Sequence, residues 1–202
     1  MVLVLVGVAV VIGAVLAWVN NITEKPIAEK AQQTLAAGIK EVMNSTDIKV
    51  EDPQPVKMEI QGKESIFTIH NVHTTDGAYL GSAVESTTMG FGGDLKVLVG
   101  FNAEGTILGY TILQASETPG LGAKADKWFQ KDGKGNIIGK SVAKGDLKVS
   151  KDGGDVDAIT ASTITSRAFL KAVNQAYSAY QDNHAANAKG ADGASGASVQ
   201  HN

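Results

Sequence analysis

The sequence of 202 residues contains no cysteine. This absence excludes disulfide bonds, thiolate zinc sites, cysteine-ligated iron–sulfur clusters and a cysteine nucleophile. A basic excess is also missing, because 18 Lys and Arg stand against 21 Asp and Glu, for a formal net charge of −3. Non-specific nucleic-acid binding needs a basic surface, so we expect no nucleic-acid partner.

Long apolar runs are scarce, which excludes a polytopic membrane protein. The one such run covers residues 1–19 and would span about 28 Å as a helix, close to the hydrocarbon thickness of a bilayer. Trp18 at its end suits the interfacial aromatic belt. We therefore expect residues 1–20 to form a transmembrane anchor in contact with membrane lipid. A cleaved signal peptide is the alternative, which the length of the run and the lack of a charged segment before it disfavour.

The charges beside this run bear on its orientation. Lys25 and Lys30 follow the run and no basic residue precedes it. By the positive-inside rule alone, this asymmetry would place the bulk of the protein in the cytoplasm. Glu24 and Glu29 are interleaved with the two lysines and weaken that indication.

Hydrophobic periodicity and turn residues indicate the elements that follow. Apolar residues at helical spacing predict a helix over 23–43, and residues 44–55 predict a break. Alternating and apolar runs bounded by Gly and Asn predict five strands. A short helix is expected at 123–130, then two short strands separated by glycines 133 to 145, and then a helix over 166–181 with one apolar stripe. The predicted strands are 56–60, 66–70, 79–84, 95–101 and 107–113.

The predicted organisation has four parts. A transmembrane anchor over 1–20 precedes a helical stalk over 21–45 and a folded domain over 46–182. Residues 183–202 contain mostly Ala, Gly, Ser and Asn, a composition typical of a disordered tail.

The segment 117–122, with the sequence ETPGLG, is the first candidate site. Its Pro-Gly pair favours a turn, and its two glycines allow backbone to approach a flat ligand closely. Thr118 supplies a hydroxyl and Leu121 an apolar side chain. A plain turn that leads into the helix at 123–130 is the alternative.

The second candidate site is a cluster of hydroxyl residues just before the predicted C-terminal helix. Thr160, Ser162, Thr163 and Thr165 are followed by Ser166. Helix N-caps are usually Ser or Thr, but one cap needs one hydroxyl rather than five. Free N–H groups at a helix N-terminus also bind phosphate, so the segment could hold a phosphate, even covalently through a threonine oxygen.

Other motifs predict neither a catalytic residue nor a metal site. His70 and His73 lie at a strand end, where positions three apart point to opposite faces. No Walker loop, nucleotide-binding strand–loop–helix or Ser/His/Asp order is present. The glycine-rich residues 90–93 precede a strand rather than a helix, which indicates a turn where backbone passes close to another segment.

At the two candidate segments the sequence resembles the FMN-binding domain family. This family is shared by the G subunits of Rnf-type electron-transport complexes and the C subunits of Na⁺-translocating NADH:quinone reductases. Residues 117–122 match its ETPGLG stretch at every position. Residues 157–165 match its flavinylation motif D-x-x-[ST]-G-A-T-x-[ST], with Ala161 in place of Gly and Ser162 in place of Ala. The resemblance covers residues 1 to about 181.

The resemblance implies a covalent FMN. Its phosphate would be joined to Thr163 by a separate flavin transferase that uses FAD and a divalent metal. Thr118, Leu121 and Gly122 would then line the flavin ring. Around the phosphate the family pattern implies three further hydroxyl residues, namely Thr160, Ser162 and Thr165.

The resemblance also implies a fold, a role and a location. The fold is α+β, in which a single N-terminal transmembrane helix precedes an antiparallel-sheet FMN-binding domain with flanking helices. The role is to relay electrons between subunits of an Rnf-type complex that couples electron transfer to ion translocation, without turnover of a substrate of its own. The FMN domain would lie on the outer, periplasmic face of the inner membrane, contrary to the charge count.

Three alternatives remain open at this point. Within the family, the chain could be a quinone reductase C subunit, although residues 90–93 leading into strand 95–101 favour the Rnf relative. Outside it, the chain could be a non-redox membrane-anchored structural domain. It could also be a stand-alone extracellular flavin reductase.

Overall fold

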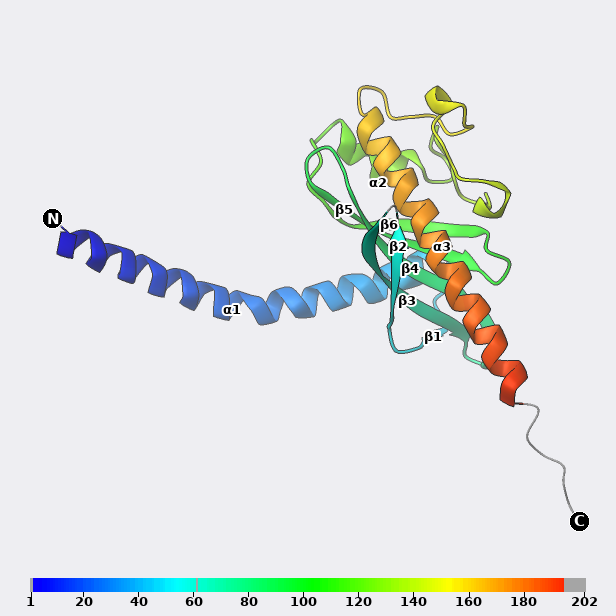
Figure 1. Ribbon diagram of the computed structural model, residues 1–202, viewed down its shortest axis with the longest axis horizontal. Coiled ribbons are helices and arrows are strands. Elements are labelled where there is room, and N and C mark those ends of the chain that lie inside the picture. The colour runs from blue at the N-terminus through cyan, green and yellow to red at the C-terminus, as the bar shows by residue number, and fades with distance from the viewer. Residues whose placement is uncertain (1, 61, 195–202) are drawn as a thin grey trace, which may run out of the picture. The chain divides into compact units, whose positions relative to one another are not determined.

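The computed structural model describes residues 2–60 and 62–194, and it divides the chain into two units between Ala37 and Gly38 (Figure 1). The helices and strands are, in chain order, α1 (Val2–Val42), β1 (Ile48–Val50), β2 (Gln54–Ile60), β3 (Lys63–Thr74), β4 (Tyr79–Met89), β5 (Asp94–Asn102), β6 (Ile107–Ala115), η1 (Gly122–Lys124), α2 (Ala125–Trp128), η2 (Val142–Lys144), η3 (Ser150–Asp152) and α3 (Thr163–Ala194).

The first unit consists of the N-terminal part of α1. By length and composition this helix can cross a membrane. Its described apolar side chains are exposed on every side, from Val4 at 69% to Trp18 at 65%. A helix that is apolar all round suits a lipid environment rather than water. The helix predicted over 23–43 is the unbroken continuation of this segment.

The second unit is built on one antiparallel sheet. Its strands run in the order β1-β3-β4-β5-β6, and β2 pairs with β3 beside β1. All five strands predicted from the sequence are present. The three-residue β1 lies inside the predicted break. It was not predicted, because it is too short to produce a periodic pattern.

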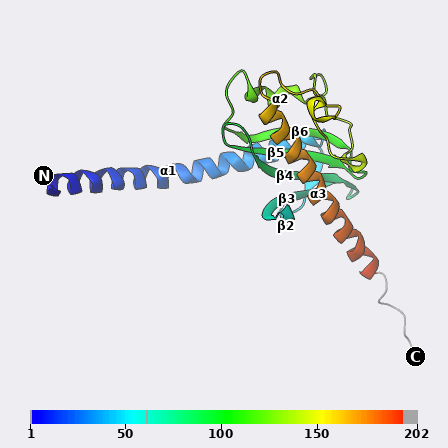
Figure 2. The same cartoon turned by 45° about the horizontal axis from the view of Figure 1, so that its top comes forward.

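The long helix α3 covers one face of this sheet, as both views of the ribbon show (Figure 2). The predicted apolar stripe of Phe169, Val173, Ala176 and Tyr180 is buried in the main core. Hydrogen bonds fasten the helix to strands: among them, Thr88 Oγ1 donates to Ala168 O at 2.9 Å, and Tyr180 Oη donates to Asn102 O at 3.0 Å. The α+β class and the antiparallel sheet are therefore as predicted.

The last turn of α1 packs against the sheet within this second unit. Gly100 of β5 and Gly109 of β6 are register partners, and a methyl group on Gly100 would overlap with the Val42 carbonyl oxygen. Gly38 lies against Thr111 and Leu98 in the same way. The paired glycines form a notch in the sheet that accepts the end of the helix.

Two predictions about the C-terminal half differ from the structure. The strands predicted around glycines 133 to 145 are wrong, because the described residues there form turns and η2, with isolated bridges such as Thr106–Ser141. Helix α3 extends to Ala194 rather than ending near residue 181. Alanine-rich sequence has high helix propensity, and Asn183 donates to Gln54 Oε1 at 2.8 Å. Residues 195–202 of the predicted tail lie outside the described residues.

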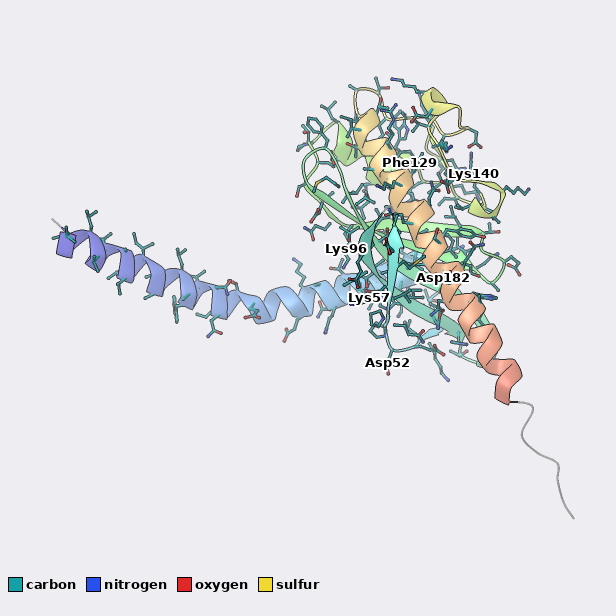
Figure 3. The ribbon with its side chains drawn as sticks, in the orientation of Figure 1. Asp52, Lys57, Lys96, Phe129, Lys140 and Asp182 are labelled. Carbon is teal, nitrogen blue, oxygen red and sulfur yellow. The ribbon has the colours of Figure 1, made fainter. Side chains whose placement is uncertain are left out.

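The sheet contains one buried charged cluster. Glu85 on β4 accepts from His70 Nε2 at 2.8 Å and from Lys96 Nζ at 2.6 Å, and its side chain is 8% exposed. Figure 3 marks the position of Lys96. Burial raises the pKa of Glu85, but hydrogen bonds from His70 and Lys96 and the charge on Lys96 outweigh it. The pKa of Glu85 therefore lies below its ordinary value of 4.5.

We predict that Glu85→Gln destabilises the domain at neutral pH by about 1–3 kcal/mol, because it removes a paired buried charge. A depressed carboxyl pKa adds stability that is complete above pH 4.5 and is lost as the pH falls through the folded-state value. The thermal unfolding temperature of the variant should therefore fall less steeply with acidification below pH 4.5 than that of the parent. Glu59→Gln on the exposed side of β2 is the control and should follow the parent.

Candidate functional site

Both candidate segments contribute residues to the lining of one pocket of about 370 Å³. This volume falls within the range of ordinary ligand pockets. Its lining consists of Phe91, Glu117, Thr118, Leu121, Gly122, Ala161, Ser162, Thr163, Ile164 and Thr165. A ligand in this pocket would therefore contact both motifs at once.

A tight turn places the hydroxyl cluster at the start of α3. Ser162 N donates to Ile159 O at 3.0 Å, and Ser166 closes the turn by accepting from Ile159 N and donating to Ser162 O. Ala161 within the turn has φ of 61°. That left-handed conformation is unfavourable for a residue with a side chain, which explains why the family motif has glycine at this position.

The carboxylate of Glu117 connects three segments of the site. Its Oε1 accepts from Phe91 N at 2.7 Å, in the loop between β4 and β5. Its Oε2 accepts from Thr165 Oγ1 at 2.8 Å, in the first turn of α3. Glu117 itself follows β6, so one side chain fixes the distances among a sheet loop, the 117–122 segment and the helix N-terminus.

The glycines of the site have different physical roles. Gly122 is buried, and a methyl group there would overlap with Glu117 and lie 2.8 Å from Thr165 Oγ1. A methyl group on Gly92 would overlap with the Ser116 carbonyl oxygen, as expected for a turn where backbone passes close to another segment. Gly120 has open space around it but a φ of 76°, so it is required by the turn rather than by close contact.

Apolar side chains at the pocket are unusually exposed. Phe91 is 68% exposed, Ile164 55% and Leu121 40%, and all three line the pocket. Apolar atoms left in water at a pocket favour an apolar ligand surface against them. The hydroxyls and backbone N–H groups at the start of α3 are instead suited to an anionic group.

Aromatic residues pack against the helix that carries part of the hydroxyl cluster and against the segment before it. Phe129 stacks on Phe169 of α3 with ring centroids 4.3 Å apart, and Tyr110 meets Phe169 edge-on at 4.7 Å. Tyr110 Oη donates to Ala125 O at 2.6 Å, and burial raises the pKa of this hydroxyl. Trp128 Nε1 donates to the carbonyl oxygen of Asp157 at 2.8 Å. This hydrogen bond fixes the backbone at the start of the hydroxyl segment.

The structure brings together most of the residues that the sequence singled out. Six of the seven predicted cofactor residues line the pocket: Thr118, Leu121, Gly122, Ser162, Thr163 and Thr165. Thr160 is exposed and lies outside this lining.

Sequence reasoning missed Phe91, Glu117, Ala161 and Ile164 as pocket residues. Glu117 and Ala161 lie inside the recognised motifs, and the glycines around Phe91 indicated a close backbone approach. Nothing in the sequence indicated that this approach was to Glu117.

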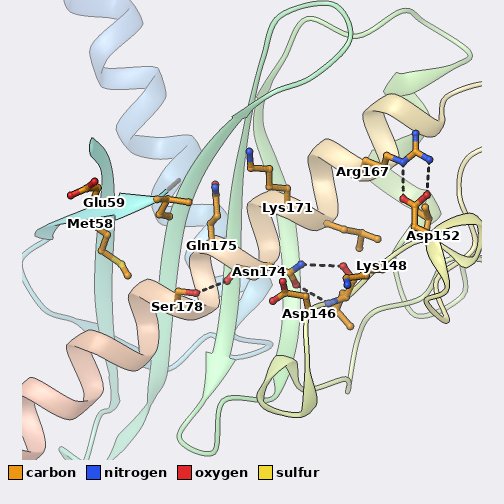
Figure 4. A pocket seen from close by; sticks show the side chains of 14 residues that line it. Met58, Glu59, Asp146, Lys148, Asp152, Arg167, Lys171, Asn174, Gln175 and Ser178 are labelled. Atoms are coloured by element: carbon orange, nitrogen blue, oxygen red, sulfur yellow. Dashed lines mark hydrogen bonds and ion pairs between the residues drawn. The ribbon is translucent and has the colours of Figure 1, made fainter. Parts of the chain in front are cut away.

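A second, larger groove of about 740 Å³ runs along α3, and no residue of either motif is part of its lining (Figure 4). Two clamps hold the segment 146–152 against the helix there. Asn174 exchanges two 3.0 Å hydrogen bonds with the backbone of Leu147. Arg167 forms a bidentate ion pair with Asp152 at 2.7 and 2.6 Å. The guanidinium keeps the pKa of Asp152 below its ordinary range.

Comparisons with known proteins agree with this geometry. Residues 90–178, which include the whole pocket lining, match the family model of the FMN-binding domain. The chain is 32% identical over 192 residues to the G subunit of the Na⁺-translocating ferredoxin:NAD⁺ oxidoreductase complex of Acetobacterium woodii, covering 89% of this chain and 90% of that protein. It is 30% identical over 189 residues to the G subunit of the ion-translocating oxidoreductase complex of Shewanella baltica, covering 88% and 86%.

A solved structure shares the fold. The crystal structure of Shewanella oneidensis NqrC matches with a TM-score of 0.60 and 15% identity, over 78% of this chain and 99% of that one.

The strained backbone at Ala161 leads to a prediction. Ala161→Gly should stabilise the protein by about 0.5–1 kcal/mol, because relief of the left-handed strain exceeds the entropic cost of glycine. The thermal unfolding temperature should rise by roughly 2–4 °C for each kcal/mol in a domain of this size. Ala158→Gly, at a position without positive φ, is the matched control and should not raise it. A lower unfolding temperature for Ala161→Gly would contradict this explanation of the motif.

Proposed function

This chain belongs to the family of G subunits of ion-translocating oxidoreductase complexes, and from that membership we propose that it is a membrane-anchored subunit that binds FMN and relays electrons within an Rnf-type complex. The observation that carries the proposal is that residues of both motifs line the same pocket. This pocket joins exposed apolar side chains to the hydroxyl-rich N-terminus of α3. A flavin mononucleotide has the matching parts, an apolar planar ring and a phosphate.

The residues of the pocket fit FMN by their chemistry. Phe91, Leu121 and Ile164 offer apolar surface for the ring. Ser162 is 8% exposed at the base of the helix and, with the N–H groups of the first turn, suits a phosphate. When bound, FMN supplies one- and two-electron transfer. The chain's own contribution is to hold the ring, to limit the access of water to one side of it and to orient it toward partner subunits.

We propose that the attachment is covalent and that Thr163 is the acceptor. Thr163 lines the pocket at the first residue of α3. In the maturation step, a bond forms between Thr163 Oγ1 and the FMN-side phosphorus of FAD. The phosphoanhydride bond to AMP breaks, AMP leaves, and the hydroxyl proton passes to a base of the flavin transferase. Thr163 is therefore a modified residue and not a nucleophile for turnover by this protein.

The proposed location follows from the anchor and the family. Residues 1–20 would contact the lipid of the inner membrane, and the FMN domain would lie on its periplasmic face. A covalent bond is useful there, because a flavin lost outside the cytoplasm cannot be replaced from the cytoplasmic pool. The other members of the complex would be the electron donor and acceptor. The relatives named as G subunits favour this role over that of a quinone reductase C subunit.

The proposed attachment of FMN to Thr163 can be tested by intact mass. Co-expressed with a flavin transferase, the full chain should gain the mass of one FMN less one water, and the product should stay yellow after denaturation and washing. Thr163→Val should abolish this gain, because it removes the only oxygen of that side chain. Thr160→Val is the matched control, since Thr160 is exposed and outside the pocket, and it should be modified normally. Flavin retained by Thr163→Val would refute the assignment.

The side of the membrane on which the FMN domain lies can be tested with protease. Protease added to intact spheroplasts should digest the FMN domain if it lies on the periplasmic face, and immunoblotting with an antibody to residues 46–182 measures the loss. A cytoplasmic marker protein must survive the same treatment. Protection that ends only on lysis would support the orientation given by the positive-inside rule instead.

A further inference from the structure

Lys151 is a basic side chain at the acceptor position that neither motif includes. Its Nζ donates to Thr163 Oγ1 at 3.4 Å. The contact joins the short helix η3 to the first residue of α3. It is at the long end for a hydrogen bond, and the residue is exposed, so in the unmodified protein it contributes little to stability.

The backbone around Lys151 is nevertheless fixed. Lys151 lies next to Asp152, whose carboxylate is held by two guanidinium nitrogens of Arg167 on α3 (Figure 4). A few residues earlier, Leu147 is bound through its backbone to Asn174, also on α3. The segment that carries Lys151 is thus clamped to the same helix that presents Thr163.

The charges nearby leave Lys151 available for an anion. Arg167 is already paired with Asp152, so its charge is neutralised locally. Lys151 has no carboxylate partner in the ion pairs of the described part of the chain, and its hydrogen-bond partner is the Thr163 hydroxyl. The ammonium group of Lys151 would be attracted more strongly to a negatively charged oxygen at that place than to the neutral hydroxyl of Thr163.

We propose that Lys151 is the counter-ion of the phosphoryl group attached to Thr163. The inference rests on the proposed function, because it requires a phosphoester at that threonine. The Asp152–Arg167 ion pair has an indirect role. It holds the segment that carries Lys151 beside Thr163, and it neutralises the charge of Arg167, which could otherwise compete with Lys151 for the phosphate. The phosphodiester keeps one negative charge at all physiological pH values, so the charge that Lys151 would face does not change with pH in that range.

The test compares the full chain, purified in detergent, before and after attachment of FMN by a flavin transferase. The gain in thermal unfolding temperature on attachment is measured at about 0.1 M and about 1 M salt, where the Debye length falls from about 10 Å to about 3 Å. In the parent protein the gain should be larger at low salt, because an exposed ion pair is screened. In Lys151→Ala the gain should be smaller and the same at both salt concentrations. Lys151→Arg should restore the salt dependence.

Lys148→Ala is the matched control. Lys148 is an exposed lysine of the same clamped segment, but it lines the larger groove and, among the described residues, Thr163 Oγ1 is contacted by Lys151 and not by Lys148. This variant should keep the salt-dependent gain of the parent. Intact mass confirms attachment in each variant, and complete loss of attachment in a Lys151→Ala protein that unfolds at the parent temperature would also support the proposal.

Two outcomes overturn the proposal. One is an equal salt dependence of the gain in the parent and in Lys151→Ala, whatever the rate of attachment. The other is a parent protein whose gain does not depend on salt. Both are distinct from the failure of the proposed function, in which the parent accepts no FMN at all and its mass does not change.

Discussion

One carboxylate fixes the geometry of the pocket. Glu117 receives a backbone N–H from the loop between β4 and β5 and a hydroxyl from the first turn of α3. The two donors are far apart in the chain, at Phe91 and Thr165. Gly122 must lack a side chain so that this carboxylate can reach Thr165. Glu117 therefore links the loop that carries Phe91 to the N-terminus of α3 across the site.

The fold class could be predicted from the sequence because the strands are long and regular. β4, β5 and β6 each contain nine residues or more, so their periodicity and the turn at 102–105 could be recognised. The prediction of two short strands around glycines 133 to 145 was wrong, because these residues form turns, in which Gly139 and Gly145 have positive φ. The motifs located the two walls of the pocket. Their contact through Glu117 and the position of Lys151 depend on tertiary packing, which no local pattern encodes.

Backbone strain and the proposed attachment site lie in the same turn. Ala161 has a left-handed backbone where the family has glycine, and the turn it occupies ends at Thr163. Strain of this kind persists only where the surrounding structure over-determines it. Here Ser166 closes the turn with two hydrogen bonds, and the indole of Trp128 holds its beginning. The hydroxyl of Thr163, the proposed acceptor, is thus held on a well-fixed turn, although this residue is only partly buried.

The notch made by Gly100 and Gly109 has a consequence for how the domain can be isolated. Gly38 to Val42 belong to the folded unit, and Ile39, Val42 and Met43 are buried in it. A fragment cut where the first strand begins would lose this plug. The face of β5 and β6 around Gly100, Gly109 and Leu98 would then be exposed to water, and newly exposed apolar surface favours aggregation. A soluble fragment of this protein should therefore retain the final turn of the helix, even though the rest of that helix is suited to lipid.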